Sequence, residues 1–166
     1  MKTNYRARNL FLCQAAIIAS LYVALTYLSR LLGLDSMAIQ VRFSEMLCVL
    51  PIIMPSAVPG LAVGCLLSNI LVGAHWLDIL IGPLATLIGA LGTYALRKIK
   101  WLAPLPAVLS NALIIPFVLA YGYGLEDAIP FMMLTVGLGE IISVYCLGMI
   151  FYFAVRKSLD KILNVK

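Results

Sequence analysis

Residues 46–74 read MLCVLPIIMPSAVPGLAVGCLLSNILVGA and carry no charged side chain. A helix that crosses a bilayer needs about 20 mostly apolar residues, so this stretch is long enough for more than one helix. Pro51, Pro55 and Pro59 interrupt it, and proline removes a backbone donor and bends or ends a helix. We therefore expect two short or tilted apolar helices that turn at residues 55–60. A single re-entrant segment is the alternative topology.

The rest of the chain has the same apolar character. Of its 166 residues, 63% are hydrophobic and 11% are charged, which is too little polar surface for a soluble domain. We predict an all-α integral membrane protein, a six-transmembrane-helix bundle that forms a single transmembrane domain over residues 1–166. The expected spans are residues 10–32, 44 to 51–55, 57–72, 77–96, 102–121 and 128–155.

The N-terminus superficially resembles a secretory signal, because basic residues precede an apolar run. The run over residues 10–28 is longer than the apolar region of a signal, and further apolar spans follow it. We therefore expect this segment to be retained as the first transmembrane helix.

The distribution of charge predicts the orientation. If both termini are cytoplasmic, ten of the twelve basic residues lie inside, as the positive-inside rule requires, and only Arg30 and Arg42 lie outside. The inner basic residues are Lys2, Arg6, Arg8, Arg97, Lys98, Lys100, Arg156, Lys157, Lys161 and Lys166. The outer acidic residues are Asp35, Glu45, Asp78, Glu126 and Asp127. We expect a multi-pass protein of the plasma membrane whose negative outer entrance favours a cationic ligand, although sorting of basic residues alone would leave the same acids outside.

Several classes of function are not indicated. The net charge of +5 does not predict nucleic-acid binding, because the basic residues gather at the expected membrane edges. The four cysteines are dispersed without a CxxC pair, and His75 and Asp78 lack further ligands at suitable spacing, so no metal site is predicted. No phosphate-binding GxxxxGK[ST] loop and no hydrolase motif is present. We expect no enzymatic activity and no cofactor, and ATP-driven transport would require an ATPase on another chain.

Glu140 is the clearest candidate for ligand binding. It lies within the sixth expected span, where an ionisable side chain is costly unless it faces a cavity or a partner. Gly137 and Gly139 beside it permit close approach of a neighbouring helix or a ligand. The alternative is a protonated Glu140 that is hydrogen-bonded to another helix.

Other polar residues fall within or beside the expected spans. Asn69 and Asn111 offer amide donors and acceptors that suit the edge of a heterocyclic base, although hydrogen bonds between helices would use them equally well. His75 and Asp78 lie one turn apart at the outer end of the fourth span. Trp76 would either stack on a ligand or anchor the helix at the membrane interface.

Arg42 and Glu45 open the second span and are three residues apart, so one helical turn would bring them together. They would form an ion pair or bind a ligand. Tyr121 and Tyr123 end the fifth span, where they would form an aromatic belt or line a pocket.

Small residues recur at helical spacing along the first span. They are Ala15, Ala16, Ala19, Ser20 and Ala24. Such a stripe lets another helix pack closely, either from this chain or from a separate membrane subunit.

Several segments together resemble the QueT family of queuosine-precursor transporters. They are QVRFSE at 40–45, the Leu-Pro pair at 50–51, PGLAVGCLLSN at 59–69, LDILIGPLATL at 77–87 and PAVLSNA at 106–112. The resemblance extends over residues 10–155, and the linked set is more specific than any one segment.

This resemblance implies the substrate-binding S component of an energy-coupling-factor transporter, a six-helix bundle with its ligand pocket near the outer face. Its partners would be a transmembrane coupling subunit and two ATPase subunits. The row of Ala15, Ala19 and Ala24 would be the docking surface for the coupling subunit. In this class the S component is thought to topple in the membrane and so carry its ligand inward.

The implied ligand is a deazapurine, either queuine or its aminomethyl precursor. Its ammonium and N–H donors would pair with carboxylates, its edge with amides, and its ring with Trp76 or a tyrosine. The candidate substrate contacts are Glu140, Asn111, Asn69, Asp78, Glu45, Trp76, His75 and Arg42. The alternatives are an S component for another vitamin, an accessory membrane protein without a ligand, and a membrane-embedded enzyme, which the missing motifs disfavour.

Overall fold

The computed structural model of the chain describes residues 2–34 and 40–163, with side chains over 5–34 and 40–158. Every regular element in these ranges is a helix. In chain order the elements are α1 (Lys2–Leu31), η1 (Phe43–Ile52), α2 (Ala57–Leu71), α3 (Trp76–Ala95), α4 (Leu105–Gly122), α5 (Ile129–Glu140), η2 (Ile141–Leu147) and α6 (Gly148–Leu163). Asp35, which we expected on the outer side, lies outside the described residues.

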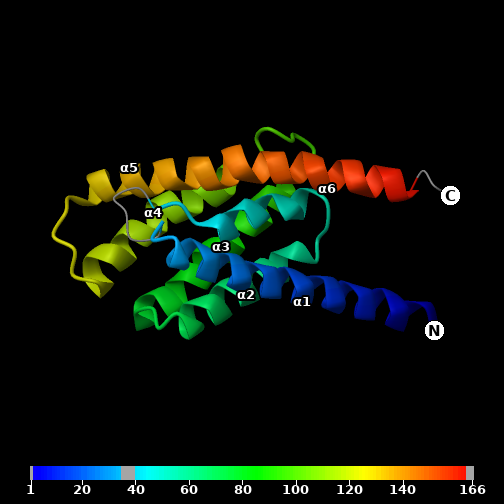
Figure 1. Cartoon of the computed structure of the whole chain (residues 1–166), viewed down its shortest axis with the longest axis horizontal. Helices are drawn as coiled ribbons and strands as arrows, with labels where there is room; N and C mark the ends of the chain where they lie inside the picture. Colours follow the sequence, from blue (N-terminus) through cyan, green and yellow to red (C-terminus); the bar gives the residue numbers. More distant parts are fainter. Residues whose placement is uncertain (1, 35–39, 164–166) are drawn as a thin grey trace.

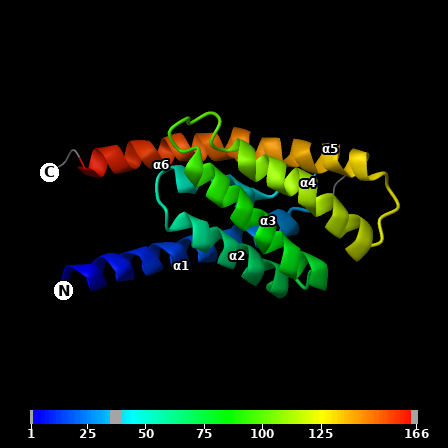
Figure 2. The ribbon, with the colours of Figure 1, turned by 180° about the vertical axis from the view of Figure 1, so that it is seen from behind.

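The helices run roughly along one long axis (Figure 1). Both termini lie at one end of the bundle, and the connection between α4 and α5 lies at the other end, as the reverse view also shows (Figure 2). At the terminal end, α1 and α6 extend beyond their neighbours. This arrangement puts both termini on the same side, as the predicted orientation requires.

Four helical stretches in the described ranges are long and apolar enough to cross a membrane. They are Tyr5–Leu31, Trp76–Ala95, Leu105–Gly122 and Ile129–Ser158. Two further apolar helices, Phe43–Ile52 and Ala57–Leu71, are shorter. The structure therefore supports an all-helical membrane protein with four candidate spans among its helices, and the prolines divide the charge-free stretch into two short helices as expected.

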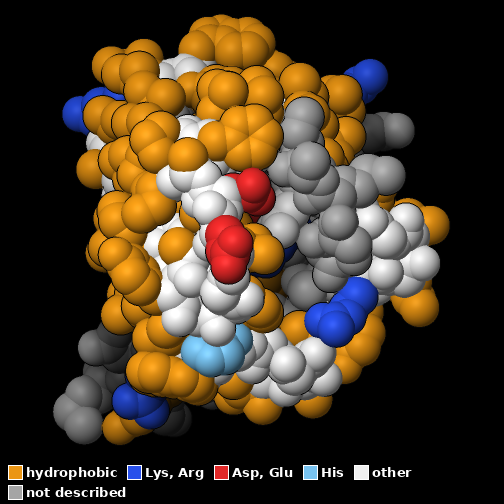
Figure 3. Space-filling view, turned by 90° about the vertical axis from the view of Figure 1, so that its left-hand side faces the viewer, with side chains coloured by type: hydrophobic (Ala, Val, Ile, Leu, Met, Phe, Trp, Pro, Cys, Tyr) orange, Lys and Arg blue, Asp and Glu red, His pale blue; other side chains and the backbone are white. Residues whose placement is uncertain are grey.

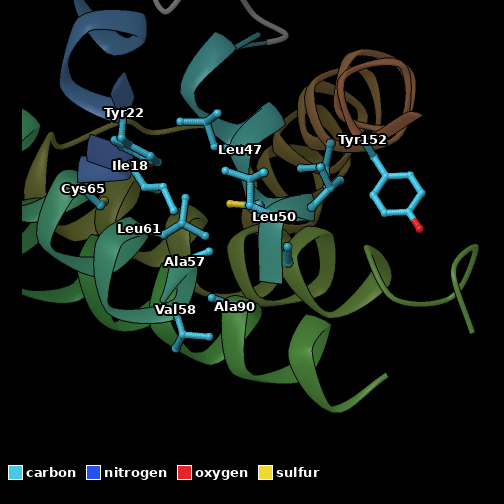
Figure 4. Packing of buried hydrophobic residues seen from close by; sticks show 14 of the residues in the cluster. Ile18, Tyr22, Leu47, Leu50, Ala57, Val58, Leu61, Cys65, Ala90 and Tyr152 are labelled. Atoms are coloured by element: carbon cyan, nitrogen blue, oxygen red, sulfur yellow. The ribbon is translucent and has the colours of Figure 1, made fainter. Parts of the chain in front are cut away.

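The short helix η1 depends on its neighbours for cover. It is a 3₁₀ helix of 10 residues, and all but three of them are buried. It packs against α1, α3, η2 and α6. Side chains of η1 such as Leu47 and Leu50 lie in one apolar cluster with Ile18 of α1 and Leu61 of α2 (Figure 4). Because these neighbours surround η1, its backbone is kept away from lipid, where unsatisfied polar groups are not tolerated.

Two glycines bring α2 unusually close to α1. A Cβ atom on Gly60 would lie 2.8 Å from the carbonyl oxygen of Ala15, and one on Gly64 would lie 3.0 Å from the Cα of Ala19. A side chain at either position would force the two backbones apart. Because glycine has no side chain, α1 and α2 can make this contact.

This contact corrects the docking surface expected on the first helix. Ala19 is 5% exposed and, together with Ala15, packs against α2 inside the chain. Only Ala24 of that expected row is exposed, together with Ala16 and Ser20 from the same helix. The spacing of small residues correctly predicted a close contact between helices. For Ala15 and Ala19, however, the contacting helix is α2 of the same chain.

Candidate ligand-binding site

Two adjoining cavities lie among the helices. The larger, which we call the wide chamber, has a volume of about 290 Å³ and is bordered by the ends of α1, α2 and α4 and the start of α3. The smaller, the narrow chamber, has a volume of about 20 Å³. Gln40 and Arg42 line both chambers and therefore lie at their shared border, which we call the wall. Figure 3 looks onto the end of the bundle opposite the termini, where acidic and basic side chains border a hollow.

The narrow chamber is surrounded by a buried polar network. The Glu45 carboxylate accepts hydrogen bonds from the Tyr22 hydroxyl, from the Cys48 thiol at 3.1 Å and from Asn111 Nδ2 at 3.4 Å. Asn111 Nδ2 also donates to Glu140 Oε1 at 3.0 Å. Glu45 is 2% and Glu140 7% exposed. A single amide therefore links two buried carboxylates that come from η1 and α5.

Two carboxylate oxygens in the described part of the chain are buried without a hydrogen-bond partner. They are Glu140 Oε2 and Asp78 Oδ1. Glu140 lines the narrow chamber and Asp78 lines the wide chamber. An unpartnered buried polar atom costs about 1–3 kcal/mol, so both positions would be stabilised by a molecule that supplies donors.

The other side of Asp78 is held in place by its neighbours. Asn69 Nδ2 donates to the Asp78 backbone carbonyl at 3.0 Å, and the Tyr123 hydroxyl donates to Asp78 Oδ2 at 3.4 Å. The same hydroxyl accepts from the backbone N–H of His75 at 3.0 Å. Burial raises the pKa of Tyr123, so its hydroxyl remains a donor at neutral pH.

Gly82 leaves the space that the Asp78 and Asn69 side chains occupy. A Cβ atom on this glycine would lie 2.9 Å from Asp78 Oδ1 and 2.8 Å from Asn69 Nδ2. Gly82 also lines the narrow chamber. It therefore lies both at the narrow chamber and close to two residues, Asp78 and Asn69, that line the wide chamber.

Arg42 supplies positive charge at the wall between the chambers. Its backbone N–H donates to Ser143 Oγ at 3.2 Å, which ties the wall to η2. Burial alone would lower the pKa of the guanidinium, but nearby acidic groups, Asp78 first and also Glu45, raise it above its ordinary value. Arg42 therefore stays charged, although the direct ion pair with Glu45 that the spacing allowed is not formed among the described residues.

Comparison with known proteins places this chain in a family. A family model described as QueT transporter matches residues 12–157. The chain belongs to the QueT transporter family. The queuosine precursor transporter QueT of Lactococcus lactis subsp. cremoris (strain MG1363) is 37% identical to it over 73 residues. That alignment covers 44% of this chain and 43% of the relative, and no solved structure matches.

Membership of the QueT family confirms the resemblance drawn from the segments between residues 40 and 112. Together with the apolar helices, it makes this chain a membrane protein of a transporter family. No cluster of metal-ligating side chains occurs among the residues that the structure describes.

The structure brings most of the predicted site residues of this QueT-family chain to the two chambers. Those that line a chamber are Arg42, Glu45, Asn69, Asp78, Asn111 and Glu140. Trp76 lines neither chamber and is 60% exposed, as an interfacial anchor would be. His75 also lines neither, and its Nδ1 accepts from the Leu77 N–H at the start of α3.

Some residues of the site were not predicted. Gln40, Cys65 and Thr86 line the narrow chamber, and Tyr22 donates to Glu45 from within the first helix. An aromatic residue in an apolar helix usually packs in a core, so nothing in the pattern of residues singles out Tyr22. Thr86 did carry a signal, because it is a polar residue inside an otherwise apolar span.

Proposed function

We propose that this QueT-family chain is the S component of an energy-coupling-factor importer and captures a queuosine precursor from outside the cell. The observation that carries the proposal is the pair of buried, unpartnered carboxylate oxygens of Asp78 and Glu140 beside two chambers. Family membership and the name of the Lactococcus relative support the choice of ligand class. The ligand would be queuine or aminomethyl-deazaguanine.

The wide chamber suits a compact heterocycle. Its volume of about 290 Å³ is close to the lower end of the roughly 300–1,000 Å³ range of small-molecule sites. Asp78 Oδ1 would accept from the N–H donors of a guanine-like edge, and the Arg42 guanidinium would donate to a ring carbonyl. Both contacts are charge-assisted and therefore stronger than neutral hydrogen bonds. Tyr123 would provide an aromatic side chain against the ring.

The charges at the two ends of the bundle support an orientation in the plasma membrane. Arg6 and Arg8 begin α1, and Arg156 and Lys157 lie near the end of α6, so both pairs belong to the terminal end. By the positive-inside rule this end would be cytoplasmic. The wide chamber, at the opposite end, would then receive its ligand from outside.

ATP-driven transport would require partner subunits, because the chain has no phosphate-binding loop. The partners would be a transmembrane coupling subunit and two ATPase subunits. The exposed small residues Ala16, Ser20 and Ala24 on α1 would let a helix of the coupling subunit approach closely. Ala15 and Ala19, which pack against α2, would support this face from behind.

Equilibrium binding to the purified chain tests the proposal. We would titrate queuine, aminomethyl-deazaguanine, thiamine and riboflavin, and follow intrinsic fluorescence and thermal stability. Saturable binding of a deazapurine, with no response to thiamine or riboflavin, is expected. Binding of only thiamine or riboflavin would reassign the chain to another vitamin. No response to any of the four would instead favour an accessory membrane protein without a ligand.

A further inference from the structure

The two chambers differ more than tenfold in volume. The wide chamber measures about 290 Å³ and the narrow chamber about 20 Å³. A cavity needs about 10–15 Å³ to hold one water molecule, so the narrow chamber has room for a single group of that size. Of these two chambers, only the wide one has room for a purine-like ring.

Glu140, which lines the narrow chamber, nevertheless has one free acceptor. Each Glu45 oxygen already accepts a hydrogen bond, from Tyr22 at Oε1 and from Cys48 and Asn111 at Oε2. Glu140 accepts only one at Oε1, and its Oε2 is buried without a partner. A ligand group that completes this network from the narrow chamber is therefore small and donates a hydrogen bond to Glu140.

Acidic side chains outnumber basic ones around the narrow chamber. Two carboxylates, Glu45 and Glu140, line it, whereas Arg42 is the one cationic side chain among the described residues that do so. The remaining described lining residues, such as Thr86 and Gln40, are uncharged. A primary ammonium is compact and has three N–H donors, so it matches the chamber in size, charge and donor number.

We propose that the two chambers are separate subsites for one ligand. The wide chamber holds the planar deazaguanine, and the narrow chamber holds only its primary ammonium, which donates to Glu140 Oε2. This inference rests on the proposed function and deepens it by assigning the substrate. The chain selects the aminomethyl precursor over queuine, because the queuine amine carries a cyclopentene ring that is far larger than the narrow chamber.

The reverse placement does not fit the same cavities. If the ammonium paired with Asp78 in the wide chamber, the ring would have to enter the narrow chamber, whose volume is about 20 Å³. With the ring in the wide chamber, an N–H donor of its guanine-like edge supplies the hydrogen bond that Asp78 Oδ1 lacks. Each unpartnered oxygen thereby receives a donor from a different part of one molecule.

The test compares three ligands on purified full-length chain by isothermal titration calorimetry. Aminomethyl-deazaguanine has the ammonium, cyano-deazaguanine has the same ring without a charge, and queuine has the bulky amine. The wild type is expected to bind the aminomethyl compound at least tenfold more tightly than either of the others. Equal affinities for the three ligands would overturn the assignment of the narrow chamber.

Variants separate the two subsites. Glu140→Gln should weaken binding of the aminomethyl compound about 10- to 100-fold, the range expected for loss of a charged hydrogen bond, and should leave binding of the cyano compound unchanged. Asp78→Asn should weaken both ligands by a similar factor. Glu126→Gln removes an exposed carboxylate that lines neither chamber and should affect neither ligand. Equal losses for both ligands in Glu140→Gln would contradict the proposal.

A second measurement does not depend on how the variants fold. N-methylation and N,N-dimethylation of the aminomethyl ligand enlarge the ammonium without removing its charge, and each methyl group should weaken wild-type binding at least fivefold. Unchanged affinity would show that the amine does not occupy a confined space. If none of the deazaguanines binds the wild type, the proposed function itself fails. If they bind without this order of affinity, only the subsite assignment fails.

Discussion

Replacing Gly139 with alanine should disturb the wall between the chambers. A Cβ atom at Gly139 would overlap the carbonyl oxygen of Gln40 and lie 2.9 Å from its carbonyl carbon. These are backbone atoms, so they cannot rotate away as the end of a flexible side chain would. Because Gln40 and Arg42 line both chambers, any shift that relieves the overlap also moves the site.

A matched variant two residues away isolates the stability cost of this overlap. Gly137→Ala places its Cβ 3.5 Å from the Ala112 Cβ, which is ordinary contact. Both substitutions gain about 0.8–1 kcal/mol from the better helix propensity of alanine. Only Gly139→Ala adds the cost of overpacking, about 1–3 kcal/mol. The Gly139→Ala protein should therefore be about 1–3 kcal/mol less stable than the Gly137→Ala protein.

Unfolding of both purified variants in the same detergent measures this difference, and calorimetry with aminomethyl-deazaguanine measures the effect on the site. We expect Gly139→Ala alone to lower both stability and affinity. Equal stability of the two variants would refute the close packing of α5 against Gln40. Lower stability with unchanged affinity would refute the role of this wall in the site.

Three further predictions concern the network, the partner face and the orientation. Tyr22→Phe removes one donor to Glu45 and should lower the free energy of unfolding by about 1–3 kcal/mol, so an unchanged denaturation midpoint would count against the network. Ala24→Trp should fold and bind ligand but lose co-purification with the coupling subunit, whereas Ala19→Trp should fail to fold because that side chain is buried. Normal co-purification of Ala24→Trp would remove that face from the interface. In a chain whose native cysteines are replaced by serine, Glu126→Cys should react with a membrane-impermeant maleimide in intact cells and Lys98→Cys only after lysis. The opposite pattern would invert the proposed orientation.

The positions of the helices were largely predictable, because apolar runs and prolines set them. The span expected over 57–72 is α2 at Ala57–Leu71, and the span expected over 77–96 is α3 at Trp76–Ala95. The 3₁₀ geometry of η1 and the π helix η2 were not predicted. Both depend on how the helices pack, since hydrophobic periodicity does not distinguish these geometries over such short segments.

The residues that line the chambers were predictable where a polar side chain is costly in a membrane. Glu45, Asp78 and Glu140 all lie at the chambers, because burial of a carboxylate in an apolar span requires a cavity or a partner. For residues that occur both in helix contacts and at exposed positions, the sequence does not show whether the side chain is buried. Trp76 is exposed at the end of a helix, and Ala19 is buried against Gly64. Spacing alone does not show which face of a helix meets another helix of the same chain.

An experimentally determined structure of the chain with bound aminomethyl-deazaguanine would test the central claim most directly. We predict the planar ring in the wide chamber with an N–H donor within hydrogen-bond distance of Asp78 Oδ1, and the amine nitrogen within the same distance of Glu140 Oε2. Ligand bound elsewhere, or an amine that points away from Glu140 toward the open end of the wide chamber, would contradict the account.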